Sequence, residues 1–289
     1  MSTRSLTRLP GVVDRHVHLG LVDHAPLAGS ALVEVHDLGW SPRQAVAWKA
    51  APPGDLVAVR TAGPFHTAPG GYPTGRAWAP ADAVRAVASE EEAWAAVATL
   101  SDEGLDALKL TLHSDMPLLS DEVLRALVDA AHDAGLPALV HAEGTGQAAR
   151  AIDAGADVLV HTPWTERLAD DLLERGAAMT WISTLAIHDE NHRAIALDNL
   201  RRFRLHGGTV VYGTDMGNGP TPVGPNPEEI RLLGAVGLVG DDLLVAVLGP
   251  LEDPAPERTL VSALPRPHDA EDLIAWLASA TRLTTRETP

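Results

Sequence analysis

The chain has 289 residues, of which 45% are hydrophobic and 21% charged, so it can bury the core of one large domain or two small ones. Its formal net charge of -17 has the wrong sign for binding a phosphate backbone or an anionic membrane surface, which argues against nucleic-acid and membrane partners. No stretch approaches the ~20 apolar residues of a membrane span, and the N-terminal segment lacks the apolar core of a secretory signal. We therefore expect a soluble cytoplasmic protein that acts on a small-molecule substrate, with homo-oligomerisation left open.

The chain contains no cysteine but has 13 histidines. This excludes a disulfide framework, a thiol nucleophile and a thiolate metal site. Any metal must be held by His, Asp, Glu or a modified Lys. The histidines therefore become the main candidates for chemistry.

Short runs rich in Leu and β-branched residues alternate with helical patterns, which predicts βα units and a parallel sheet. The predicted strands lie at 11–17, 31–36, 56–61, 107–112, 137–141, 157–161, 178–186 and 208–213. Eight parallel strands with intervening helices close most economically into a distorted (β/α)8 TIM-type barrel, and a doubly wound open sheet is the alternative. We assign residues 1–250 to the barrel and 251–289 to a C-terminal extension with a helix over 270–280.

Local signals add detail to this outline. Three predicted helices carry end signals. Ser89 with Glu92 forms a capping box at the start of one helix, Ser120 opens a second that stops at Gly135, and Thr165 and Gly176 bracket a third. The stretch 63–80 is rich in glycine and proline and too long for an ordinary turn. We expect it to arch over the barrel mouth as a lid.

Two histidines, His16 and His18, lie on the first predicted strand. Because strand side chains alternate between faces, both imidazoles point to the same side, which in a barrel can be the inward one. An HxH pair alone is a weak signal in a histidine-rich chain.

The chain has only two lysines, Lys49 and Lys109. Alternation in the strand DALKLTL directs Lys109 inward, where an ammonium is costly unless it is paired or chemically changed. Its amine could form a carbamate with carbon dioxide and bridge two metals, or form a Schiff base with a carbonyl substrate. The structural alternative is a strand-end lysine that reaches solvent.

Three more metal-competent residues follow later strands. His141 and His161 end consecutive strands, and Asp215 follows the last strand in VVYGTD. A single strand-end histidine is more often a packing residue than a ligand. Several strands that each present such a group at the same end, however, indicate a shared site at the carboxyl rim of the barrel.

These residues together resemble the amidohydrolase superfamily of metal-dependent barrel hydrolases. The matching segments are GVVDRHVH with His16 and His18, DALKL with Lys109, LVHAEG with His141, GADVLVHT with His161 and YGTD with Asp215. The resemblance covers roughly residues 11–248 and is strongest to the imidazolonepropionase-like and prolidase-like branch. Many members of that branch carry a small β-sandwich built from residues before the HxH pair and from a C-terminal segment. In this chain the pair begins at residue 16, so the N-terminal half of such a sandwich has no room. Family members also often carry a second histidine where Glu143 stands.

The resemblance implies a binuclear centre. His16, His18 and Asp215 would hold one divalent metal, His141 and His161 the second, and carboxylated Lys109 would bridge them. Zinc is the expected metal, and Asp215 is the expected catalytic base. Two such ions lower the pKa of a shared water from about 15.7 to about 7, which supplies hydroxide at neutral pH.

The implied activity is hydrolysis of an amide, lactam or other C–N bond of a small molecule. The alternatives are a lactonase or phosphotriesterase-like hydrolase, a mononuclear deaminase with Glu143 as proton shuttle, and a lyase or cyclase that consumes no water. A metal-stabilised binding protein is a further alternative, from outside catalysis. Six residues in loops or at strand ends are candidate substrate contacts: His66, Tyr72, His113, Glu143, Trp164 and His188.

Overall fold

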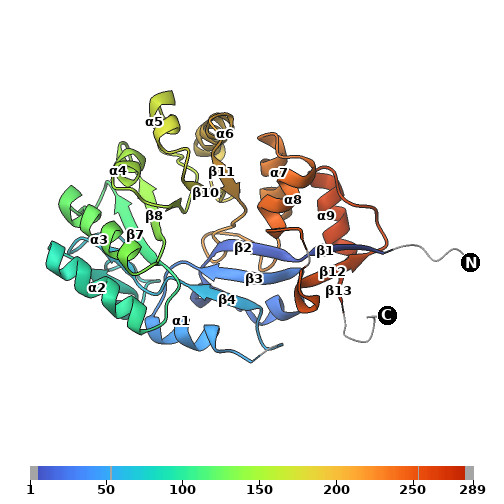
Figure 1. The fold of residues 1–289 in the computed structure, drawn as a ribbon, viewed down its shortest axis with the longest axis horizontal. Coiled ribbons are helices and arrows are strands. Elements are labelled where there is room, and N and C mark those ends of the chain that lie inside the picture. The colour runs from blue at the N-terminus through green and yellow to red at the C-terminus, as the bar shows by residue number, and fades with distance from the viewer. Residues whose placement is uncertain (1–5, 53, 253, 284–289) are drawn as a thin grey trace, which may run out of the picture.

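The computed structural model describes residues 6–52, 54–252 and 254–283, so the last six residues of the predicted C-terminal extension lie outside the described part. A parallel sheet of seven strands has the order β11-β10-β9-β8-β7-β5-β6 (Figure 1). Its strands are β5 (Phe65–Thr67), β6 (Val84–Ala86), β7 (Leu108–His113), β8 (Ala138–Glu143), β9 (Val158–Leu159), β10 (Thr180–Ile182) and β11 (Thr209–Val211).

A second parallel sheet contains β2 (Val12–Val17), β3 (Leu32–Asp37) and β4 (Ala58–Thr61). Backbone hydrogen bonds join both edges of this smaller sheet to segments that adjoin strands of the larger sheet. On one edge, the amide of His18 donates to Met216 O at 2.7 Å, and on the other the amide of Asp106 donates to Thr61 O at 2.8 Å. All eight predicted strands are present in these two sheets. The expected α/β class with parallel strands is confirmed.

Helices connect the strands. They are α1 (Pro42–Lys49), α2 (Glu90–Asp102), α3 (Asp121–Asp133), α4 (Gln147–Asp153), α5 (Asp170–Arg175), α6 (Glu190–Leu205), α7 (Pro227–Ala235), α8 (Gly240–Leu248) and α9 (Ala270–Ser279). In Figure 1, α2 to α6 lie along the outer side of the larger sheet, whereas α9 packs against α7 and the strand β12 (Thr259–Ser262). The predicted caps of α2 and α3 are confirmed, since Ser89 Oγ accepts from Glu92 N and Ser120 Oγ accepts from Val123 N.

The core lies between the sheet and these helices. On α3 the buried residues recur at helical spacing, including Val123, Leu124, Leu127 and Val128, and form one apolar face. Trp181 on β10 stacks on Phe203 of α6 with ring centroids 3.8 Å apart. Burying each large apolar side chain contributes roughly 1.5–3 kcal/mol, and this packing fixes the strand ends that carry the site.

Two local expectations are corrected. The helix that ends at Gly176 begins at Asp170, and Thr165 instead accepts a hydrogen bond from the amide of Gly144. Within 63–80, expected to be entirely a loop, Phe65–Thr67 forms strand β5 and pairs with β7. A strand of three residues between glycines and prolines has too short a pattern to recognise, and its pairing supplies what its local sequence lacks.

The two ends of the described chain meet in a small antiparallel sheet. It has the order β1-β12-β13, formed by β1 (Thr7–Pro10), β12 (Thr259–Ser262) and β13 (Thr281–Arg282). This sheet lies beside β2 and β3 at the right of Figure 1. The predicted helix over 270–280 is confirmed as α9. None of the helices in the described ranges is long and apolar enough to cross a membrane.

Candidate metal centre

The six side chains that the sequence predicts as metal ligands converge on one cavity of about 220 Å³. They come from β2 (His16 and the adjacent His18), β7 (Lys109), β8 (His141), the end of β9 (His161) and the loop after β11 (Asp215). The carboxyl ends of parallel strands meet at one rim, so residues far apart in the sequence become neighbours.

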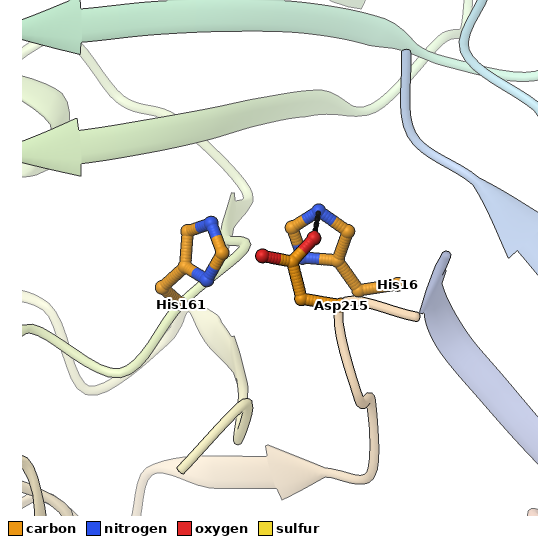
Figure 2. A group of neighbouring side chains, drawn as sticks. All are labelled: His16, His161 and Asp215. Atoms are coloured by element: carbon orange, nitrogen blue, oxygen red, sulfur yellow. Dashed lines mark ion pairs between the residues drawn. The ribbon is translucent and has the colours of Figure 1, made fainter. Parts of the chain in front are cut away.

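Three of the six are especially close. The potential ligand atoms of His16, His161 and Asp215 lie within 4.8 Å of one another, and all three residues are buried. Figure 2 shows the Asp215 carboxylate between the two imidazoles. His18 also approaches this group, with its Nε2 3.2 Å from Asp215 Oδ1. His141 lies further out, its ring centroid 4.9 Å from that of His161.

The surroundings of His16 and His18 fix which ring nitrogen carries the proton. His16 Nδ1 lies 2.8 Å from Val160 O, and His18 Nδ1 lies 3.2 Å from Gly39 O. A carbonyl oxygen can only accept, so in each neutral ring Nδ1 is the donor and Nε2 keeps an unshared electron pair. Both rings therefore present Nε2 as a ligand, in the way that metal-binding histidines are oriented.

The other two histidines are also held at one nitrogen. His161 Nδ1 lies 2.9 Å from Thr184 Oγ1, and His141 Nε2 lies 3.0 Å from Glu143 Oε2. Glu143 thus orients His141 by a carboxylate contact of the kind that raises the basicity of a metal-binding imidazole.

The centre of the site holds facing acceptors. His16 Nε2 and Asp215 Oδ1 are 3.4 Å apart, both are buried, and neither has a hydrogen-bond partner among the described residues. With Nδ1 as the donor, the neutral His16 ring has no proton left for Asp215. Two buried lone pairs that face each other are unfavourable without a cation or an added proton between them. The donor set of imidazole nitrogens and a carboxylate fits a divalent metal such as zinc.

Burial also sets the charge of these ligands. Desolvation lowers the pKa of His16, His141 and His161, so these rings are neutral at pH 7, the form that binds metals. Burial alone would raise the pKa of Asp215, but the ring of His16, when it carries a proton, and the contact with His18 hold it well below its usual range. The site therefore offers one carboxylate among neutral rings.

Lys109 is 1% exposed and lies inside this cavity. Burial lowers the pKa of its amine to about 7, although Asp215 and Asp37 partly oppose that effect. A large fraction of the amine is therefore neutral at neutral pH. The neutral amine is the form that can react with carbon dioxide or with a carbonyl group.

Backbone strain coincides with the site. Asp215 and Thr184 are the non-glycine residues with positive φ in the described ranges, at 53° and 41°. Such conformations cost of order 1–3 kcal/mol each and persist where surrounding contacts enforce them. Asp215 is a site residue itself, and Thr184 contacts His161.

Two buried carboxyl groups hold the backbone next to Asp215 and Thr184 in place. Neither was singled out from the sequence. Asp14 Oδ1 accepts from the amides of His16 and Thr214, and Glu229 accepts from the amides of Leu185 and Ala186. Asp14 could be suspected, because it is acidic and lies two residues before His16 in a strand. Glu229 lies on α7, and nothing in its local sequence links it to a loop more than forty residues away.

The structure places five of the six candidate substrate contacts beside the ligands. Tyr72 lines the cavity and stacks on His141 with ring centroids 5.3 Å apart. The others form contacts around the ligands: Glu143 with His141, His113 with Tyr72 and Glu143, Trp164 with His161, and His188 with Trp164.

His66 is the exception and corrects our expectation. It is fully buried, its Nδ1 contacts Lys109 O, and it borders a different cavity together with Asp82 and Arg85. Because alternation along β5 turns Phe65 into the metal-site cavity, the adjacent His66 points the other way. Sequence reasoning placed this segment in a loop and could not assign its faces.

The cavity has further lining residues that the sequence analysis did not single out. They are Leu21, Phe65, Trp78, Thr111, Gly217 and Asn218. Asn218 follows Asp215 by three residues, and its Nδ2 donates to Asp215 Oδ2 at 2.8 Å. A polar residue so close to a predicted ligand is a signal that could have identified it.

Solved structures of hydrolases share this fold. The resemblance predicted from the sequence is confirmed at the level of the fold, because solved structures of amidohydrolases superpose on most of the chain. No protein-family model and no curated protein matched the sequence.

Three of the similar structures illustrate the range of enzymes that share this fold. A Xaa-Pro dipeptidase with bound methionine has 22% identity and a TM-score of 0.70, covering 95% of this chain and 84% of that one. Molinate hydrolase has 16% identity and a TM-score of 0.67, covering 95% and 81%. Phenylurea hydrolase B has 15% identity and a TM-score of 0.70, covering 94% and 82%.

Proposed function

We propose that the chain is a metal-dependent hydrolase of the amidohydrolase superfamily that cleaves an amide, lactam or other C–N bond of a small molecule. The hydrogen bonds that join the two parallel sheets at both edges support a distorted (β/α)8 barrel as its scaffold. The neighbours described as dipeptidase, molinate hydrolase and phenylurea hydrolase support this class of reaction. Fold alone does not fix function, so the site must carry the argument.

The proposed centre holds two divalent ions, with zinc the expected metal. His16, His18 and Asp215 would bind one ion, His141 and His161 the other, and Lys109 would bridge them as a carbamate. When bound, such ions lower the pKa of water to about 7 and polarise the carbonyl group of the substrate.

The side chains of this chain then have distinct tasks. Asn218 fixes the Asp215 carboxylate by donating to its Oδ2, and Asp215 would accept a proton from the attacking water and pass it to the leaving nitrogen. Glu143 fixes the ring of His141, and Thr184 fixes that of His161. Burial of the ligands keeps bulk water away from the reacting centre.

The observation that carries the proposal is the buried pair of acceptors, His16 Nε2 and Asp215 Oδ1, 3.4 Å apart. The test is to purify the protein with divalent ions and bicarbonate and to screen amides, lactams, lactones and phosphotriesters, with chelator-treated protein as the control. We expect metal-dependent turnover of a C–N substrate and a product mass increased by about 18 Da, because water is consumed.

Other results would redirect or end the proposal. Release of ammonia by protein with one ion and an unmodified lysine would indicate the deaminase alternative. Turnover confined to lactones or phosphotriesters would indicate the lactonase or phosphotriesterase alternative. A product without added water would indicate a lyase or cyclase. No metal-dependent turnover in the whole screen would leave a metal-stabilised binding protein.

A further inference from the structure

Aromatic rings form one wall of the metal-site cavity. Phe65, Tyr72 and Trp78 all line it. The Phe65 and Trp78 rings meet edge to face at 5.9 Å, and the Tyr72 and Trp78 rings lie 6.2 Å apart. The wall reaches the ligands, because the ring of His18 lies 6.3 Å from Trp78 and that of His141 lies 5.3 Å from Tyr72.

The same wall lacks a group that would bind an anion. Among the described residues that line the cavity, Lys109 is the one cationic side chain, and it lies among the ligands. The nearby Arg76 is exposed and does not line the cavity, and its Cζ lies 5.8 Å from the Tyr72 ring centroid. Carboxylate recognition in proteins normally uses an arginine fork or a lysine.

Two polar side chains that line the cavity, Thr111 and Asn218, are already engaged in hydrogen bonds. Thr111 Oγ1 donates to Tyr72 O at 2.5 Å, and Asn218 Nδ2 donates to Asp215 Oδ2. The wall that faces the metal ligands is therefore aromatic and contains no cationic side chain among its described residues.

The size of the cavity limits the substrate. Its volume of about 220 Å³ is below the roughly 300–1,000 Å³ typical of sites for drug-sized ligands. One planar ring and one adjoining functional group are a reasonable content for this space.

On the basis of the proposed function, we infer that the substrate is a small neutral amide, anilide or carbamate with an aromatic or similarly flat apolar group next to the scissile bond. Phe65, Tyr72 and Trp78 hold this group, and a substrate with a charged group at its far end is disfavoured. Burying a carboxylate against three rings without a partner is costly, whereas a neutral ring gains contact area and edge-to-face geometry. Trp78 is the main specificity-determining residue, since it contacts both other rings.

The test compares three amides on the metal-loaded enzyme: acetanilide, 4-acetamidobenzoate, which adds a remote carboxylate, and N-methylacetamide, which lacks the ring. We expect kcat/KM for acetanilide to exceed both others by about tenfold or more. Binding of the same three compounds, measured by calorimetry, should follow the same order and does not require turnover. A preference for the carboxylate in both measurements, or no preference in either, would overturn the inference.

Substitutions at Trp78 test whether the aromatic wall causes the preference for acetanilide. Trp78→Ala should raise KM for acetanilide about tenfold and lower the ratio of kcat/KM for acetanilide to that for N-methylacetamide by a similar factor, and Trp78→Phe should restore most of that ratio. The matched control is Trp94→Ala, because Trp94 on α2 is 48% exposed. Equal losses on all three compounds in both Trp78 variants would contradict a role in specificity. Metal content and turnover of N-methylacetamide report separately on the proposed function, so a failed hydrolase assignment is distinguishable from a failed substrate assignment.

Discussion

The hydroxyl oxygen of Thr184 lies 2.9 Å from Nδ1 of His161, and Thr184 holds this position with a φ of 41°. A β-branched residue rarely adopts this backbone conformation, so nearby contacts must enforce it. The next two amides along the chain, those of Leu185 and Ala186, donate to the buried carboxylate of Glu229. A strained residue is thus held in place by one helix while it orients a candidate metal ligand.

Removal of the Thr184 hydroxyl should weaken metal binding. Thr184→Val keeps the shape of the side chain but leaves His161 Nδ1 without its partner. Loss of such an outer contact typically lowers metal affinity by about 10- to 100-fold, and we expect that range here. Chelator competition measures the affinity directly. Thr184→Ser keeps the hydroxyl and serves as the control, and equal metal affinity in both variants would refute the role of this contact.

The Asp215→Asn substitution should separate chemistry from metal binding. Asparagine keeps an oxygen ligand but is a far weaker base, so kcat should fall by about 10²- to 10⁴-fold while most metal binding is retained. Steady-state kinetics and elemental analysis of the same preparation provide the two readouts. Undiminished kcat would show that Asp215 is not the base.

The buried carboxyl group of Glu229 predicts a pH dependence of stability. Burial raises its pKa from 4.5 to about 7, so folding favours the protonated form. Its contribution to stability is fully present below pH 4.5 and is lost as the pH rises to about 7, by up to about 3 kcal/mol. Urea unfolding between pH 4.5 and 8 should show a shallower decline for Glu229→Gln than for the unmodified chain. An identical pH slope would contradict the shifted pKa, whatever the absolute stability of the variant.

Truncation of the stacked pair behind the site should cost stability without changing the ligands. Trp181 is fully buried, and its ring lies parallel to that of Phe203 at 3.8 Å. Trp181→Ala should reduce the free energy of unfolding by about 3–5 kcal/mol. Leu205→Ala, at a residue 85% exposed, should change it by less than about 0.5 kcal/mol. Equal effects in denaturant titrations would show that the stack is not an important part of the core.

The six candidate ligand residues could be picked out from the sequence because each lies on or just after a strand with a clear apolar pattern. His141 and His161 end two similar runs, and convergence at one rim follows from parallel strands. Lys109 stands out for a different reason, since alternation directs one of only two lysines inward.

The supporting residues are harder to predict because their roles depend on tertiary contacts. Glu229 and Thr184 act through backbone amides and a strained φ, neither of which leaves a local pattern. Phe65 and His66 illustrate a second limit. Once their segment is read as a loop, no periodicity tells which of the two faces the site.

We propose that six side chains, including a carboxylated lysine, bind two metal ions. The most direct test of this proposal is elemental analysis with intact mass measurement of the protein prepared with bicarbonate and divalent ions. Lys49, the other lysine, pairs with Asp106 away from the site and supplies the control. We predict two ions per chain and an additional mass of about 44 Da, both retained in Lys49→Met, whereas Lys109→Met loses the added mass and the paired stoichiometry. Protein that binds no metal, or has an unmodified Lys109 with a single ion, would contradict the account.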